Sequence, residues 1–141
     1  MKALVDTCII IDAMQSREPF FDDAQNLLIA EANGEFDGVI TASSLMDIYY
    51  ITHKYSQSSL KAHDVIATLS SLFEVCDTCA EDAVRAVRSN MNDYEDAVMA
   101  ETAARAGADV IVTRNPKDYH NAKIKAMPPS DFLAMLDRKE S

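Results

Sequence analysis

Apolar and polar residues follow one another along this chain in a pattern that favours short buried strands alternating with amphipathic helices. The run at residues 109–113 (DVIVT) is too apolar to have a solvated face, which is typical of a central parallel strand. Strand-like runs are expected at residues 2–6, 38–42, 72–76, 109–113 and 124–127, and helical patterns at residues 7–14, 22–32, 45–55, 58–71, 80–88, 92–107 and 131–138. This alternation over residues 1–141 predicts a single α/β domain, a three-layer α/β/α sandwich with a mainly parallel central sheet of four to five strands.

The stretch from residue 92 to residue 119 organises the rest of the chain. Asn92 is a good N-cap, Glu95 falls at the capping-box position, and Gly107 is a natural stop for the helix. The line expected to face outward consists of Glu95, Thr102 and Arg105. The opposite line is mostly small residues that suit packing on a sheet, but Asp93 and Asp96 open it. The next strand brings polar residues to the carboxyl edge of the sheet, where open α/β folds bind ligands: Thr113, Arg114, Asn115, Lys117 and Asp118.

Three carboxylates from distant parts of the sequence, Asp6, Asp47 and Asp96, are expected at this same edge. Each also has a structural interpretation. Ser44 and Asp47 fit a capping box, and Asp6 could cap a turn. Asp93 and Asp96 would gain about 0.3–1 kcal/mol each from the helix dipole. Taken together, acids so close repel one another and favour a divalent cation, and carboxylates without paired His or Cys select Mg²⁺ or Mn²⁺ over zinc.

The net charge of −10 limits the classes of partner. It argues against tight, sequence-blind binding to a phosphate backbone, which relies on many Lys and Arg contacts. It is compatible with a nucleic-acid enzyme whose metal ions supply positive charge, or with a basic protein partner. No run of eighteen apolar residues is present, so the sequence predicts a cytoplasmic protein that does not span a membrane.

The pair Cys76 and Cys79 has the spacing of redox and zinc motifs, but it follows a strand in mid-chain and no histidine pair accompanies it. We interpret these cysteines as structural.

Four segments together resemble the successive signatures of PIN domains: Asp6–Asp12 (DTCIIID), Ser43–Tyr50 (SSLMDIYY), Asp93–Ala97 (DYEDA) and Thr113–Asp118 (TRNPKD). PIN domains are metal-dependent ribonucleases that include the VapC toxins of toxin–antitoxin pairs. The resemblance covers nearly the whole chain and its order of elements. It implies a PIN-like fold, a Mg²⁺- or Mn²⁺-dependent endoribonuclease activity on single-stranded or structured RNA, and an antitoxin protein as a partner.

The resemblance also implies a role for each matching residue. Asp6 and Asp96 would be the principal metal ligands, and Asp47 would be a third at a position where the family usually has the longer Glu. Asn115 stands where many members carry a fourth acid, which Asp118 could replace as a catalytic acid. Asp93 would be an auxiliary acid, Thr7 and Thr113 would orient ligands through their hydroxyls, and Asp12 would be structural.

A divalent ion in such a site would mask the charge of a phosphodiester and activate water, and in-line hydrolysis would leave a 5′-phosphate and a 3′-hydroxyl. The most basic local run follows the strand at residues 109–113 and consists of Arg114, Lys117, His120, Lys123 and Lys125. We expect Arg114, Lys117 and Lys123 to bind the RNA backbone, although a solvated surface loop would look the same. Tyr49, Tyr50 and Tyr119 could stack on bases or belong to the core.

Two other functions fit parts of the pattern. A phosphoacceptor signalling domain also gathers acids at a sheet edge, but the segment Asp6-Thr-Cys lacks the adjacent acid pair that it needs. A catalytically degenerate PIN-like domain that only binds RNA or protein would explain Asp47 and Asn115.

The middle of the chain predicts a symmetric homodimer. Ile48, Tyr49, Tyr50 and Ile51 stand in a row and surround their helix with apolar side chains on nearly every side. A second copy could cover the surplus face. In the alternative, the helix at residues 58–71 folds back and covers it within one chain.

Overall fold

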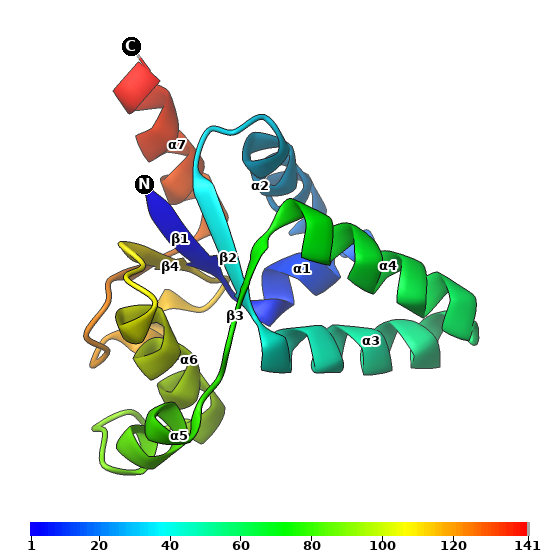
Figure 1. Cartoon of the computed structure of the whole chain (residues 1–141). Helices are drawn as coiled ribbons and strands as arrows, with labels where there is room; N and C mark the ends of the chain where they lie inside the picture. Colours follow the sequence, from blue (N-terminus) through cyan, green and yellow to red (C-terminus); the bar gives the residue numbers. More distant parts are fainter. Residues whose placement is uncertain (141) are drawn as a thin grey trace.

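Five parallel strands form the centre of the protein in the computed structural model, which describes residues 1–140 (Figure 1). They are β1 (Lys2–Val5), β2 (Asp37–Thr41), β3 (Glu74–Cys76), β4 (Val110–Val112) and β5 (Ala126–Met127). Their order in the sheet is β3-β2-β1-β4-β5, so β1 lies in the middle and pairs with both β2 and β4. This order differs from the 2-1-3-4-5 order of flavodoxin-like phosphoacceptor domains.

Helices cover both faces of the sheet and confirm the predicted three-layer α/β/α sandwich (Figure 1). They are α1 (Thr7–Met14), α2 (Phe21–Ala32), α3 (Ala42–Ser56), α4 (Ser59–Leu72), α5 (Ala80–Val87), α6 (Tyr94–Arg105) and α7 (Pro129–Glu140), with a short 3-10 helix η1 (Pro116–Tyr119). The helices α1, α2 and α7 lie on one face, and α6 lies on the other with α5 packed on it. The helices α3 and α4 pack against each other as an arm that extends away from the sheet.

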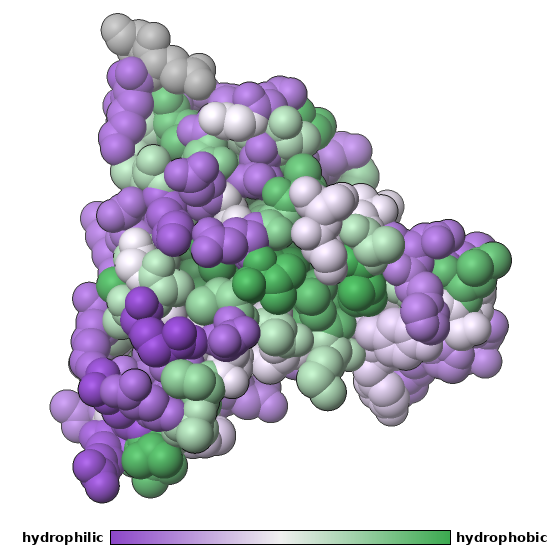
Figure 2. All heavy atoms as spheres, viewed as in Figure 1, coloured by the Kyte–Doolittle hydropathy of each residue, from purple (hydrophilic) through white to green (hydrophobic). Residues whose placement is uncertain are grey.

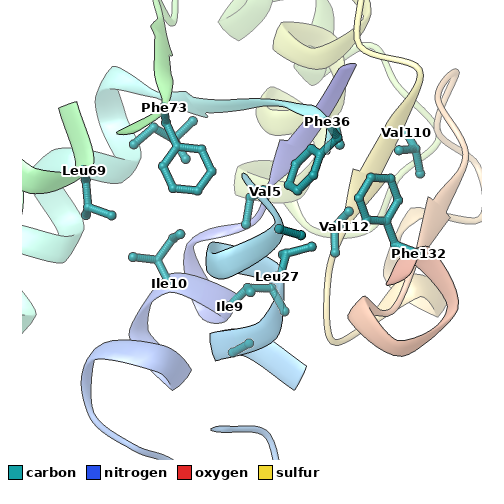
Figure 3. Packing of buried hydrophobic residues seen from close by; sticks show 14 of the residues in the cluster. Val5, Ile9, Ile10, Leu27, Phe36, Leu69, Phe73, Val110, Val112 and Phe132 are labelled. Carbon is teal, nitrogen blue, oxygen red and sulfur yellow. The ribbon is translucent and has the colours of Figure 1, made fainter. Parts of the chain in front are cut away.

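The alternation of side chains along β1 divides the core into two layers. Ala3 and Val5 join the larger cluster beneath α1, α2 and α7, whereas Leu4 points to the other face and packs with Ile111 and the alanines of α6. In the larger cluster the rings of Phe36 and Phe132 meet edge to face, with centroids 4.9 Å apart (Figure 3). The small residues of α6 therefore do what the sequence predicts and let this helix approach the sheet closely.

Two helix starts differ from the prediction and move functional residues. The N-cap of α3 is Thr41, whose hydroxyl accepts the N–H of Ser44 at 3.1 Å. Because α3 begins at Ala42, Asp47 lies in its second turn, and the expected capping box of Ser44 and Asp47 does not form. The N-cap of α6 is Asp93 rather than Asn92.

The outer side of α6 is buried by α5, so the prediction of an outward line was wrong for Thr102, which is fully buried. Asp82 of α5 explains the contact, since its buried carboxylate accepts hydrogen bonds from the Thr102 hydroxyl at 3.0 Å and from Arg105 Nη2 at 2.9 Å. It also accepts the N–H of Cys79 at 3.1 Å. Burial alone would raise the pKa of Asp82, but these hydrogen bonds lower it to about 2.

The arm covers its apolar residues only in part. Ile48 is buried, and the ring of Tyr49 lies 5.1 Å from that of His63 on α4, as expected if α4 folds back on α3. Met46 and Tyr50 stay 73% and 66% exposed. On the face viewed in Figure 2, hydrophobic residues gather in the middle of the molecule, and hydrophilic ones dominate where α5 and α6 lie.

Across residues 1–140, no helix is both long and apolar enough to cross a membrane.

Candidate active site

A cleft of about 890 Å³ opens at the carboxyl edge of the sheet, where β1 and β2 end and α1, α3 and α6 begin. It brings together six of the residues predicted for the site: Asp6, Thr7, Asp47, Asp96, Asn115 and Asp118. Other lining residues were not predicted for the site, among them Arg17, Thr41, Thr78, Tyr94 and Glu95. Five acids thus line the cleft from four segments that are far apart in the sequence: Asp6, Asp47, Glu95, Asp96 and Asp118.

Asp6 is held at the end of β1 by contacts with β4. Its N–H donates to Val112 O at 2.9 Å, and its Oδ2 accepts the Thr113 hydroxyl at 2.8 Å. Asp6 occupies the N-cap position of α1, but its side chain makes no capping hydrogen bond. The carboxylate therefore does not serve the helix, and the structural interpretation of Asp6 as a turn cap is not realised.

A buried phenol connects the two central acids. The Tyr119 hydroxyl lies 3.2 Å from Asp96 Oδ1 and 3.4 Å from Asp6 Oδ2, and both carboxylates accept its single proton in a shared hydrogen bond. Tyr119 is 2% exposed and ends η1, at the turn that follows β4. The sequence left open whether this residue stacks on bases or belongs to the core. Its ring does lie in the core, and its hydroxyl reaches the acids.

Burial and neighbouring acids raise the pKa values of two groups in the cleft. Burial raises the pKa of Asp96 to about 6, helped by the negative charges of Asp93, Asp6 and Asp118 and opposed by the Tyr119 hydrogen bond. Burial and the two acids also raise the pKa of Tyr119, which keeps its phenol protonated and able to donate. Ionisation of Asp96 in this cleft is therefore unfavourable in free energy, and a bound cation would make it more favourable.

Asp93 and Asp47 have different positions. Asp93 caps α6, with its Oδ1 accepting the N–H of Asp96 at 2.9 Å, so its structural interpretation holds. Asp47 lines the cleft from the second turn of α3. Within residues 1–140, no three Asp, Glu, His or Cys side chains lie close enough together to hold one ion as they stand. Asp6 and Asp96 share a hydrogen-bond partner in the Tyr119 hydroxyl, and Asp47 lines the same cleft.

Hydroxyl groups continue the polar edge away from the acids. Thr7 Oγ1 lies 2.7 Å from Ser44 Oγ, which accepts from Thr41 Oγ1 at 2.9 Å. Ser43 Oγ lies 3.2 Å from Thr41 Oγ1 and 3.1 Å from Thr78 Oγ1. Thr7 thus contacts another hydroxyl, while Thr113 contacts an acid. The row fixes the ends of β1, β2 and β3 relative to one another.

The basic run does not act as one surface. Arg114 turns away from the cleft toward Asp12, with Nε 3.5 Å from Asp12 Oδ2 and its guanidinium 4.2 Å from the centre of the Phe20 ring. Asp12 is fully buried, and burial raises its pKa while Arg114 opposes the rise. The expected role of Arg114 in guiding RNA does not fit this orientation, because the buried carboxylate needs a countercharge.

Lys123 also lies elsewhere. Its Nζ is 3.1 Å from Glu101 Oε2, and the residue lines a separate hollow of about 330 Å³ with Arg85 and Arg88. Lys117 is exposed on η1, directly before Asp118 of the cleft. Of the three predicted RNA-binding residues, Lys117 is thus the one beside the acids.

Comparison with known proteins gives one family and several structures of the same fold. The model of the PIN domain family matches residues 2–117. A VapBC complex of Rickettsia felis bound to promoter DNA has 17% identity and a TM-score of 0.67, covering 91% of this chain and 98% of that chain. A DNA-bound VapBC of Salmonella typhimurium has 20% identity and a TM-score of 0.65, covering 92% and 98%.

A Mycobacterium tuberculosis VapC toxin that cleaves the sarcin–ricin loop has 14% identity and a TM-score of 0.60, covering 77% of this chain and 86% of its own. At these identities the structures share a fold with this chain. No protein of curated function matches it.

Proposed function

This chain belongs to the PIN domain family, and from that premise we propose that it is a divalent-metal-dependent endoribonuclease that hydrolyses RNA phosphodiester bonds. The observation that carries the proposal is the pair of Asp6 and Asp96, tied through one phenol at the carboxyl edge of the sheet and facing a large acidic cleft. An acid whose pKa is raised to about 6 by burial and by neighbouring acids is typical of a functional group.

The residues present fit Mg²⁺ or Mn²⁺. Asp6 and Asp96 would hold the ion, and both offer carboxylate oxygens, the donors that these cations prefer. Mg²⁺ is commonly bound by one or two carboxylates with water completing its shell, so a third acid at the pair is not required. Bound there, the ion would supply neutralisation of the phosphodiester charge and activation of water.

The other residues have supporting roles in this proposal. Thr113 fixes the orientation of Asp6 through its hydroxyl. Asp118 adds a catalytic acid at the cleft, with Asn115 beside it in place of a further acid. Asp47 adds a carboxylate from α3 to the cleft, and Lys117 contacts a phosphate of the substrate strand. The acidic surface elsewhere favours a short contact with single-stranded RNA over a long one with a duplex.

We further propose that the chain is the toxin of a toxin–antitoxin pair and acts in the cytoplasm, where its RNA substrate lies. The support is family membership together with similarity in fold to structures of VapBC toxin–antitoxin complexes. The exposed apolar residues of the arm, Met46 and Tyr50 among them, support a homodimer. Sedimentation equilibrium at micromolar concentration would show twice the 15.6 kDa chain mass, and a clean monomer would contradict the dimer.

The test of the activity is cleavage of single-stranded RNA by purified protein. Cleavage should require Mg²⁺ or Mn²⁺, stop in EDTA and disappear in Asp6→Asn, because that change removes one charged ligand and keeps the shape of the side chain. Asp22→Asn is the matched control, since it makes the same chemical change on the exposed surface of α2 and should cleave like wild type. Cleavage that survives in both EDTA and Asp6→Asn would refute the proposal.

A second candidate, a PIN domain that binds RNA or protein without cutting, is favoured by the position of Asp47 outside the acid pair. In that case the cleavage assay would show no product with either metal, and a filter-binding measurement would show that the protein retains RNA.

A further inference from the structure

We propose that the Tyr119 hydroxyl is a positioning group that ties Asp6 to Asp96 and sets how tightly the pair holds a divalent cation. This inference rests on the proposed function, because it assigns a role in the same site. The ring of Tyr119 packs in the core, and its hydroxyl contacts the two acids.

The ring of Tyr119 is accounted for by the core. It packs in the cluster on the α6 face of the sheet with Leu4, Ala103 and Ile111. A phenylalanine would fill that space equally well and would avoid burying a polar atom, which is costly without a partner. The hydroxyl therefore needs an explanation of its own, and the two acids are its hydrogen-bond partners.

The contacts of the hydroxyl link the end of β1 to the first turn of α6. Asp96 Oδ1 and Asp6 Oδ2 lie 3.2 and 3.4 Å from the Tyr119 hydroxyl oxygen, so these two carboxylate oxygens can be no farther apart than the sum of the two distances. Asp6 follows β1 and Asp96 lies in the first turn of α6. Among residues 1–140, Tyr119 is the one side chain that hydrogen-bonds both carboxylates.

A neutral donor suits this place better than a cation would. The phenol draws two like charges together without neutralising them, so their demand for a cation remains. It uses Asp6 Oδ2 and Asp96 Oδ1, and the second oxygen of each carboxylate has no hydrogen bond from residues 1–140. Each acid thus keeps one oxygen for an ion while the other is anchored. Partners of this kind typically change metal affinity by about 10–100-fold when they are removed.

The decisive experiment is calorimetric titration of Mn²⁺ into metal-free wild type, Tyr119→Phe and Tyr94→Phe. Tyr119→Phe keeps the ring and should bind Mn²⁺ at least about 10-fold more weakly, because the carboxylates lose their common anchor. Tyr94→Phe is the matched control: its hydroxyl, on the same helix as Asp96 and beside the same cleft, donates to Ala83 O at 3.1 Å and to neither acid. Its Mn²⁺ affinity should stay within about 2-fold of wild type.

A double-mutant cycle in EDTA separates the anchor from simple packing. Tyr119→Phe should lower the urea midpoint of the metal-free protein, and the decrease should shrink in a background carrying Asp6→Asn and Asp96→Asn, where no charged acceptors remain. Unchanged Mn²⁺ affinity in Tyr119→Phe, or an equal decrease in both backgrounds, overturns the inference and leaves the proposed nuclease standing. Failure of wild type to bind Mn²⁺ refutes the proposed function itself, and with it a role for Tyr119 in ion binding.

Discussion

Replacing Asp96 by Asn should stabilise the metal-free protein at neutral pH. The pKa of Asp96 is raised from 3.8 to about 6, and at 1.36 kcal/mol per unit this corresponds to about 3 kcal/mol of unfavourable ionisation. Asp96 is only half-buried, so solvent and salt reduce the effect to about 1–2 kcal/mol. Asn keeps an oxygen for the Tyr119 hydroxyl, and Asp93 still caps the helix through the same backbone N–H.

The sign depends on pH in a defined window. Below about pH 4 the carboxyl is protonated in both the folded and the unfolded chain, and it imposes no penalty. Between about pH 4 and 6 the unfolded chain releases its proton first, so wild type loses stability as pH rises through the folded pKa. The variant lacks this loss. The advantage of Asp96→Asn should therefore be near zero at pH 4 and complete above about pH 6.5.

Urea unfolding in EDTA at pH 4.0 and pH 7.5 measures this difference in the free energy of unfolding. In thermal unfolding at pH 7.5, the Tm of the variant should be higher by about 3–7 °C. Asp22→Asn removes an equal charge from the exposed surface of α2 and serves as the control. A gain of the same size at pH 4.0, or one as large in Asp22→Asn, would show that net charge rather than the buried site is responsible. Added Mg²⁺ should raise the stability of wild type and have less effect on the variant.

Three further predictions concern other parts of the molecule. Asp82→Asn should lower the free energy of unfolding by about 3 kcal/mol at pH 7, because Arg105 loses its buried ionic partner. The wild-type protein should lose this contribution only as the pH falls from about 4 through 2, and acid titrations of both proteins would measure the difference. Lys117→Ala should raise KM for RNA and flatten its salt dependence, whereas Lys123→Ala should change neither, in cleavage assays at two salt concentrations. Asp47→Glu should raise Mn²⁺ affinity, because one more methylene extends the carboxylate toward the acid pair; unchanged affinity in titrations would place Asp47 outside the metal site.

The alternation of apolar runs was enough to predict the fold. Every expected strand and helix is present within a few residues, because burial on both faces of a parallel sheet leaves a strong pattern in the sequence. The helix caps were less predictable. Asn92 and Asp93 are equally good N-caps, and the extended backbone of Asp93, with φ −97° and ψ 126°, selects the second.

Contacts between elements were the part that the sequence did not reveal. Helical periodicity placed Thr102 on an outer face, but it carries no information about α5, which buries that face. Arg114 was predicted to contact RNA because it is basic and follows a strand. The fold places the buried carboxylate of Asp12 next to Arg114, and the guanidinium points to that carboxylate. The hydroxyl of Tyr119 reaches Asp6 across 113 residues of sequence, so local pattern could not assign it.

Because β1 lies in the middle of the sheet, it is synthesised before both of its neighbours, and its pairing is completed only when β4 has been made. Ala3 pairs with Val110, and the hydrogen bond from Thr113 to Asp6 spans 107 residues. While the chain is being synthesised, Asp6 and Asp96 have no fixed relation to each other. If the proposed nuclease activity needs both acids, it cannot act on the ribosome before β4 has been synthesised. Ribosome-bound chains halted before Val110 should therefore cut no RNA, and cleavage by such chains would contradict this order of assembly.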